Sequence, residues 1–377
     1  MKIIYIVNVR IPTEKTHGYQ ICKMCEEFSN QSAEVELWIP ARDVGQINNN
    51  AFFFYGLKNN FRIKKIKGTD FYKYFTQPGK FLFWLQGFLF VLQSIFIKVD
   101  KTAIIYTRDP EIGWLFNLRG FKTVYEAHTW PENRTWLYKF LIKKINKIVC
   151  ITQGLENCFV KAGYFKNNIL VAPDGVDLKK FDIDLDKGQA RNKLNLPLAK
   201  KIILYIGHLY EWKGAQDLAD AAILLKDNYL TIFVGGVDSD VAVFKEKNQA
   251  LIQDGKIAVY YHQPRQLMPR WLKAADILVL PNKSREKISS HFTSPLKLFE
   301  YMAARRPIVA SDLPSLREVL NEKNCLFFKS DDAKNLAKKI TWLLENQEMA
   351  DKITEQAYFD VKNYTWEKRA ENIIKFI

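Results

Sequence analysis

Two successive series of short apolar runs, rich in β-branched residues and separated by helix-like stretches, constrain the fold of this chain most strongly. The first series, between Lys2 and Thr152, contains KIIYIV, AEVELWIP, AIIYTRD, KTVYEAH and KIVCIT. The second, between Lys201 and Asp312, contains KIILYIGHLY, YLTIFVGG, IAVYYHQ, ADILVLPN and RPIVASD. Continuous apolar runs that alternate with helices are typical of parallel strands joined by crossover helices. We therefore predict two doubly wound α/β domains in tandem.

A segment rich in proline, glycine and aspartate, NNILVAPDGVDLKKFDIDLDKG, separates the two series. We interpret it as the connection between a first domain over residues 1–177 and a second over residues 178–363. The chain has 377 residues, 48% of them hydrophobic, which is enough to fill two cores. Ligands of parallel sheets bind outside the carboxyl ends of the strands. We therefore expect the site in a cleft between the two domains.

The five cysteines are scattered, and only Cys22 and Cys25 form a C-x-x-C pair. The surrounding GYQICKMCEEF is typical of an early helix, which would bury both thiols on one face. No second cysteine pair or nearby histidine pair supplies the other ligands of a zinc site. No secretory signal follows Met1. These features predict a reducing, cytoplasmic location.

The formal net charge of +15 is concentrated in the first half of the chain. Residues 1–180 hold 26 Lys and Arg against 15 Asp and Glu, whereas residues 181–377 hold 30 against 26. Nucleic acid, an anionic membrane surface or an anionic substrate would each account for this excess, as would solubility alone. Because the concentrated basic and aromatic motif of nucleic-acid-binding modules is lacking, we expect no nucleic acid partner.

The stretch from Phe81 to Ile97, FLFWLQGFLFVLQSIFI, carries no charge over seventeen residues. This length is at the lower limit for a membrane span. Polar pairs recur seven residues apart, at Gln86–Gly87 and Gln93–Ser94, and place a narrow polar stripe on one helical face. The pattern favours a core helix or a helix lying on a surface over a membrane span.

Two helix starts in the second half have the features of an anion site. Lys213 and Gly214 stand where a helix should begin after a strand, and the free N–H groups and positive dipole of a helix start suit a phosphate. In SPLKLFEYMA, Ser294 is a plausible N-cap and Pro295 suits the first helical position. Glu300 is the one carboxylate of this apolar helix. It either binds hydroxyl groups of a ligand or stabilises its own helix.

The second half resembles the nucleotide-sugar domain of family 4 glycosyltransferases, which are retaining enzymes of the GT-B fold. The matching stretches are VAPDGVDLKKF, LYIGHLYEWKG, FVGG, LKAADILVLPN and SPLKLFEYMAARRPIVASDLPSLREVL. The first half fits more loosely, through NVRIPTEKTHGYQ, LWIPAR, IIYTRD and YEAH. The resemblance implies an α/β fold of the GT-B type: two Rossmann-like domains facing across a cleft, the first completed by a C-terminal helix over residues 364–377.

The resemblance also implies roles for individual residues. Lys213 would bind the donor diphosphate, Glu300 the ribose of the nucleotide, and His128, helped by Glu126, would lie by the sugar at the reaction centre. Further donor contacts would come from Gly18, Gly207, His208, Ser294, Pro295 and Leu296. Arg305 or Arg306 would add positive charge near the leaving group.

Three positions depart from the family pattern. Phe292 stands where a glutamate that contacts the donor sugar is often found, His208 replaces a frequent basic residue, and Asp174 replaces the usual asparagine before Gly175. No Asp-x-Asp metal motif is evident, since Asp238-Ser239-Asp240 follows a glycine loop and is interpreted as a turn. We expect metal-independent transfer with the nucleotide-diphosphate sugar as co-substrate and no other cofactor.

The sequence therefore predicts a glycosyltransferase that moves a sugar, with retention, to a glycan or lipid-linked acceptor in surface polysaccharide or glycoconjugate assembly. Alternatives are another GT-B enzyme, such as a sugar-nucleotide epimerase, or a non-catalytic nucleic-acid-binding protein. From Lys58 to Lys101 the chain holds nine Lys and Arg against two acidic residues, interspersed with aromatics, and a second basic cluster spans Tyr138–Lys147. We expect this first domain to contact the anionic inner face of the cell membrane.

Overall fold

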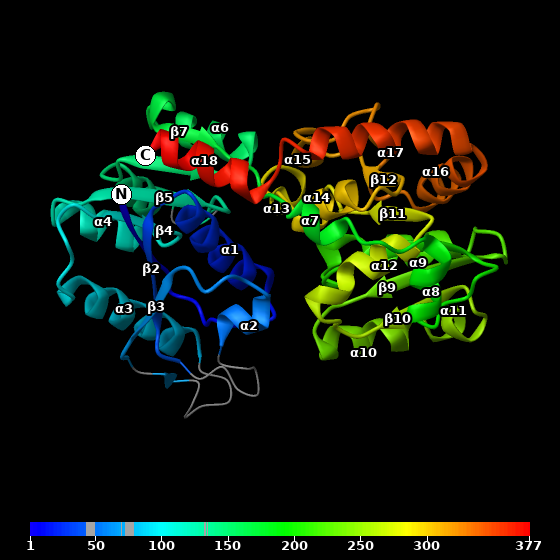
Figure 1. Cartoon of the computed structure of the whole chain (residues 1–377), viewed down its shortest axis with the longest axis horizontal. Helices are drawn as coiled ribbons and strands as arrows, with labels where there is room; N and C mark the ends of the chain where they lie inside the picture. Colours follow the sequence, from blue (N-terminus) through cyan, green and yellow to red (C-terminus); the bar gives the residue numbers. More distant parts are fainter. Residues whose placement is uncertain (43–49, 69, 72–78, 132, 134) are drawn as a thin grey trace. The chain divides into compact units, whose positions relative to one another are not determined.

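The computed structural model describes residues 1–42, 50–68, 70–71, 79–131, 133 and 135–377. The chain forms two compact domains (Figure 1). The first comprises residues 1–151, 155–172 and 366–377, and the second comprises residues 152–154 and 173–365. The sequence analysis placed these limits at 1–177 with 364–377, and at 178–363. The cleft expected between the domains stays a prediction.

The first domain is built on a seven-stranded sheet in the order β3-β2-β1-β4-β5-β6-β7, with every pairing parallel. Its central strands are almost fully buried, as apolar strands are when helices cover both faces of a sheet. The strands are β1 Lys2–Ile6, β2 Glu34–Pro40, β3 Arg62–Ile66, β4 Ile104–Thr107, β5 Lys122–Ala127, β6 Lys147–Cys150 and β7 Ile169–Val171.

Helices cover this first sheet in two groups. Right-handed crossovers that run in opposite directions from β1 and β4 place their helices on opposite faces. Side chains of α3 and α4 share a core with β1 and β4, and α18 packs on α1 although the two are far apart in sequence (Figure 1). The helices are α1 Thr16–Asn30, α2 Ala51–Tyr55, α3 Lys80–Phe96, α4 Pro110–Leu118, α5 Thr135–Ile142, α6 Gln153–Lys161 and α18 Trp366–Phe376.

The second domain repeats the design with a six-stranded parallel sheet in the order β10-β9-β8-β11-β12-β13. The strands are β8 Lys201–Ile206, β9 Tyr229–Val234, β10 Ile257–Tyr260, β11 Ile277–Leu280, β12 Ile308–Ser311 and β13 Leu326–Phe328. The helices are α7 Leu178–Phe181, α8 Lys187–Lys193, α9 Ala215–Ala222, α10 Asp238–Lys247, α11 Gln249–Gln253, α12 Met268–Ala274, α13 Lys287–Ser290, α14 Leu296–Ala303, α15 Pro314–Arg317, α16 Ala333–Glu345 and α17 Gln347–Val361.

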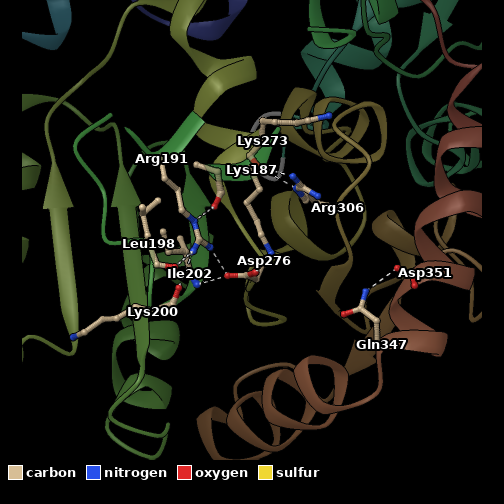
Figure 2. Close-up of polar contacts among 11 residues, drawn as sticks. Lys187, Arg191, Leu198, Lys200, Ile202, Lys273, Asp276, Arg306, Gln347 and Asp351 are labelled. Carbon is tan, nitrogen blue, oxygen red and sulfur yellow. Dashed lines mark hydrogen bonds and ion pairs between the residues drawn. The ribbon is translucent and has the colours of Figure 1, made fainter. Parts of the chain in front are cut away.

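A buried carboxylate, Asp276, ties helix α8 to the amino ends of β8 and β11 (Figure 2). It accepts hydrogen bonds from Lys187 Nζ at 2.6 Å, Arg191 Nη2 at 2.5 Å and the Ile202 amide at 2.7 Å. Arg306 donates to the Lys273 carbonyl beside this cluster. This network stabilises the end of the sheet opposite to the carboxyl ends of its strands, where ligands bind. The expectation that Arg306 lies near a leaving group is therefore wrong.

All ten predicted strands are confirmed, but the sequence analysis missed three. Strands β7 and β13 are three residues long, and β3 is a basic edge strand, RIKKI, without apolar alternation. Edge strands with lysines resist pairing with other chains, which explains the composition of β3. Asp238 and Asp240 open helix α10 rather than forming a free-standing turn. Within the described part of the chain, no helix is long and apolar enough to cross a membrane.

Candidate functional site

The turn after β8 is shaped by two glycines that no other residue could replace without strain. Gly207 adopts φ +139° and donates from its amide to the Val234 carbonyl at 2.9 Å, which holds the turn against β9. Gly214 adopts φ +71°, and a Cβ added there would lie 1.7 Å from the Pro281 carbonyl oxygen. These glycines bring the Glu211–Lys213 turn onto the end of β11 and let α9 begin directly after Lys213.

Lys213 lies at this helix start with its Nζ 3.8 Å above the Trp212 ring. Burial lowers the pKa of Lys213 to about 7, because removal from water disfavours the charged form. His208 stacks on Tyr210 with ring centroids 4.9 Å apart. The two positions that the sequence assigned to the diphosphate, Lys213 and His208, thus lie on one short turn at the carboxyl end of β8.

Helix α14 begins at the same edge of the sheet. Pro295 is the N-cap and Leu296 the first helical residue, so the predicted cap lies one residue too early. The hydroxyl oxygen of Ser294 instead accepts a hydrogen bond from the Asp174 amide at 3.1 Å. Tyr301 accepts a hydrogen bond from the Ile206 amide at 2.9 Å, which fixes α14 to the end of β8.

Lys297, which the sequence analysis did not assign, points toward this turn from the first turn of α14. Only 9% of the residue is exposed, and its Nζ lies 3.9 Å above the Tyr205 ring. A Cβ on Gly207 would lie 3.7 Å from the same Nζ. Burial, and then the charge of Lys213, hold the pKa of Lys297 well below its usual value. No described residue accepts a hydrogen bond from this nitrogen.

Glu300 has a protein partner, contrary to the expectation that only a ligand would bind its carboxylate. The guanidinium of Arg265 forms an ion pair with Glu300 Oε1. The Glu300 side chain is buried, whereas that of Arg265 is 32% exposed. Phe299 and Met302 of the same helix are fully buried. A ribose would therefore have to share the carboxylate with Arg265 or displace it.

In the first domain, Glu126 lies at the end of β5, where its carboxylate is surrounded by donors. Arg108 Nη2 lies at 2.7 Å and His128 Nε2 at 2.6 Å from Oε1, the Tyr106 hydroxyl donates to Oε2, and Arg369 of α18 lies at 3.3 Å. Burial raises the pKa of Glu126, but Arg108, Arg369 and His128 outweigh burial and hold it well below its usual value. Glu126 therefore acts by positioning its neighbours. Arg108 and Arg369 were missed because their partner is distant in sequence.

His128 keeps part of its ring exposed while bonded to Glu126. Burial, and then the charge of Arg108, lower the pKa of His128 to about 4, so its ring is neutral near pH 7. A carboxylate accepts only, so Nε2 must carry the proton and Nδ1 keeps its lone pair. His128 can therefore offer a hydrogen-bond acceptor to a hydroxyl group of a ligand.

Gly18 lies in the first turn of α1 rather than in the loop predicted before it. A Cβ at Gly18 would lie 2.1 Å from the Tyr55 hydroxyl. That hydroxyl donates to the Thr13 carbonyl and accepts from the Thr13 amide. Close packing of Tyr55 therefore explains the glycine.

The described residues contain no group of three or more His, Cys, Asp or Glu that could hold a metal ion. Cys22 and Cys25 are fully buried in α1, and burial raises the pKa of each thiol. Arg305 packs on the Tyr358 ring, away from the Lys213 turn in the fold.

The second domain matches a known family model. Residues 186–360, a little under half of the chain, match the family described as "Glycosyl transferases group 1". The matched part of the chain contains the Lys213 turn and helix α14.

Two curated relatives and one solved structure illustrate the similarity. The putative teichuronic acid biosynthesis glycosyltransferase TuaC of Bacillus subtilis is 26% identical over 68% of this chain and 63% of its own length. The N,N'-diacetylbacillosaminyl-diphospho-undecaprenol alpha-1,3-N-acetylgalactosaminyltransferase of Campylobacter jejuni is 28% identical over 63% of this chain and 60% of its own length. The chain thus matches under two thirds of each relative. Sucrose-phosphate synthase from Thermosynechococcus elongatus, with 18% identity, superposes over 100% of this chain and 98% of its own with a TM-score of 0.80, which shows the GT-B fold.

Proposed function

We propose that this protein is a glycosyltransferase that moves a sugar, with retention of configuration, from a nucleotide-diphosphate sugar to a glycan or lipid-linked acceptor. The observation that carries the proposal is a pair of lysines at the carboxyl end of β8 inside the matched domain, the buried Lys297 and the half-buried Lys213. Buried positive charge without a carboxylate partner favours an anion, and a sugar diphosphate is the anion that such domains use.

The chain's own residues suggest how the reaction would proceed. Lys213, Lys297 and the free N–H groups at the start of α14 would stabilise the negative charge that develops on the departing diphosphate. His128 would orient the sugar through Nδ1. The leaving diphosphate would accept the proton of the acceptor hydroxyl on the same face, which gives retention. We expect no metal requirement.

The surface polysaccharide and lipid-linked glycan context is proposed from the names of the relatives, which include teichuronic acid and diphospho-undecaprenol. A membrane-borne acceptor would also give a reason for the basic first domain.

Transfer is tested with a panel of UDP-, GDP- and ADP-sugars and undecaprenyl-diphosphate-linked sugars as acceptors. We first expect one nucleotide to raise the melting temperature, since a ligand at a hundred times its Kd stabilises by about 2.7 kcal/mol. Nucleoside diphosphate should then be released only when acceptor is present, and the product should keep the anomeric configuration of the donor. Release without acceptor would instead favour an epimerase, and RNA binding without donor turnover would favour a nucleic-acid-binding protein.

Helix α3 supports the proposed membrane contact because it buries polar side chains and exposes aromatic ones. Gln86 and Ser94 are buried, and the Gln86 side chain accepts from the Phe71 amide at 2.7 Å. Phe81, Trp84 and Phe88, three and four residues apart, form an exposed aromatic stripe. A water-soluble surface rarely exposes such a stripe without a partner.

Basic residues accompany this stripe. Lys64 and Lys65 of β3 are exposed, and α5 exposes Trp136, Lys139 and Phe140. Helix α4 packs beside both α3 and α5, so the exposed aromatics come from neighbouring helices. Residues 72–78 of the basic segment predicted to touch the membrane lie outside the described residues. Lysines with interfacial aromatics suit an anionic bilayer, and we propose peripheral binding at the cytoplasmic face of the cell membrane.

Flotation with liposomes tests the membrane contact. Wild-type protein should float with anionic vesicles, less so at high salt, and not with neutral vesicles. The substitutions Trp84→Ser and Phe88→Ser together should reduce flotation, as should glutamate at Lys64, Lys65 and Lys67. Phe359→Ser, on α17 of the second domain, removes a 63% exposed aromatic and should change nothing. Equal flotation with neutral and anionic vesicles, or none with either, would leave a soluble acceptor as the better explanation.

A further inference from the structure

Two lysines at the end of β8, the buried Lys297 and the half-buried Lys213, share an environment in which no described carboxylate forms an ion pair with either of them. Lys297 reaches the Gly207 turn from α14, and its nitrogen lies 3.9 Å above the Tyr205 ring. Lys213 reaches the turn from the start of α9 and also lies on a ring. Each lysine sits at the amino end of a helix, where the dipole further disfavours a cation. Two ammonium groups in such a place repel each other.

The titratable groups on the surrounding elements do not relieve this repulsion. On the β8 turn these groups are Tyr205, His208 and Glu211. Tyr205 donates to the His208 carbonyl at 2.6 Å, and burial raises its pKa, so it stays neutral. Three further carboxylates and one histidine stand on the neighbouring elements, namely Asp217 of α9, Glu300 of α14, Asp174 before α7 and His291 after α13.

Three of these neighbours, Asp217, Glu300 and His291, have partners of their own. Asp217 forms an ion pair with Lys283 at 3.3 Å and Glu300 pairs with Arg265. His291 Nδ1 lies 2.8 Å from the Ser290 hydroxyl. The charge that acts most on Lys297 is that of Lys213, which is repulsive. Among the described residues, no carboxylate forms an ion pair with either lysine of the pair.

We propose that Lys213 and Lys297 form a single proton-coupled diphosphate site, in which the empty pair holds fewer than two protons and takes up a proton from solvent when a diphosphate binds. The proposal rests on the proposed function and adds to it a second cation, Lys297, and a coupling between donor binding and protonation.

The direction of the coupling follows from the lowered pKa values. Lys213 has a pKa of about 7 in the empty site, and burial, followed by the charge of Lys213, holds that of Lys297 well below its usual value. An anion within hydrogen-bond distance favours the charged form of both lysines. The bound state therefore holds more protons than the free state. Affinity for a nucleoside diphosphate should fall as the pH rises above 7, in the range where its own phosphate groups no longer titrate, since their last pKa is about 6.

Calorimetry at pH 8 tests the coupling with UDP, GDP, ADP and inorganic pyrophosphate as separate probes. For the probe that binds, the heat is measured in HEPES and in Tris, two buffers with different ionisation enthalpies. Wild-type protein should show proton uptake on binding, and its affinity should fall between pH 7 and pH 9. Lys297→Met should weaken binding about 10- to 100-fold, the range of a lost charge-assisted hydrogen bond, and should reduce the uptake.

Stability separates a ligand role of Lys297 from a structural one. A buried lysine without a partner destabilises the fold, so Lys297→Met should melt at a higher temperature than the wild type while binding more weakly. Lys323→Met removes an exposed lysine of the same domain and should change neither property. A lower melting temperature together with unchanged affinity would overturn the proposal, as would binding without proton uptake.

The outcome also separates this proposal from the proposed function. If UDP or another probe binds tightly to both wild type and Lys297→Met without proton uptake, the coupling is wrong and the glycosyltransferase proposal stands. If none of the four probes binds to the wild type, both are wrong.

Discussion

At the residue scale, Glu300 and Arg265 form an ion pair, and substituting each partner in turn shows whether Glu300 binds a ligand or only stabilises the fold. Glu300→Ala should weaken nucleotide binding at least about tenfold, because a carboxylate that accepts ribose hydroxyls contributes roughly 1.5 kcal/mol or more. Arg265→Ala breaks the same ion pair but keeps the carboxylate, and should leave nucleotide affinity close to that of the wild type. Isothermal titration calorimetry of both variants measures these nucleotide affinities. Equal losses would mean that the ion pair, rather than the carboxylate, shapes the site.

The second prediction at this scale concerns His128 and acid. Burial, and then Arg108, lower the pKa of His128 from 6.5 to about 4, so the folded state disfavours its protonation. Between these two values the unfolded chain binds more protons, and stability should fall as the pH decreases through this window. His128→Gln should therefore lose less stability between pH 7 and pH 5 than the wild type does, as measured by urea unfolding. The pKa of His17 is also lowered to about 4, so part of the loss should remain in the variant.

At the element scale, the Lys213 turn depends on the contact between Gly214 and the end of β11. Gly214→Ala combines a positive φ with a clash against the Pro281 carbonyl oxygen. Gly163 has a similar φ of +87° with nothing within 4 Å of a Cβ, which makes it a matched control. Gly163→Ala should cost about 1 kcal/mol, and Gly214→Ala clearly more, with loss of nucleotide binding. Chemical denaturation and calorimetry measure both. Similar costs for the two variants would show that the turn can relax.

At the scale of the whole molecule, the chain returns to its first domain through α18. Trp366 is buried with its ring 6.3 Å from that of Tyr19, and Arg369 donates to the Ala172 carbonyl and lies 3.3 Å from Glu126. A chain that ends at Thr365 would expose the face of α1 on which α18 packs, and Glu126 would lose its ion pair with Arg369.

We expect this truncated chain to lose stability in the first domain only. Hydrogen exchange should rise in α1 and β5, while β8 and β11 keep their protection, since local stability follows local packing. Arg369→Met keeps the helix and should raise exchange near β5 alone. Unchanged exchange in the truncated chain would mean that α18 only covers the surface.

The two parallel sheets were predictable from the sequence, because ten of the thirteen strands in the described part of the chain are largely apolar runs, which are typical of strands buried on both faces. The position of the turn at Lys213 was also predictable, because a glycine that follows an apolar strand and precedes a helix, such as Gly214, is typical of a tight turn.

Which charged side chains form pairs could not be predicted from the sequence and follows from the folded packing. Lys297 looks like an ordinary helix lysine in the sequence, and its burial beside Gly207 and Tyr205 results from the way α14 packs on β8. Arg369 meets Glu126 across more than two hundred residues of chain. Electrostatic partners are set by distance and dielectric in three dimensions, and these leave no periodic signal in the sequence. The same holds for α3, whose polar residues turn inward, so that only the folded packing reveals its aromatic outer face.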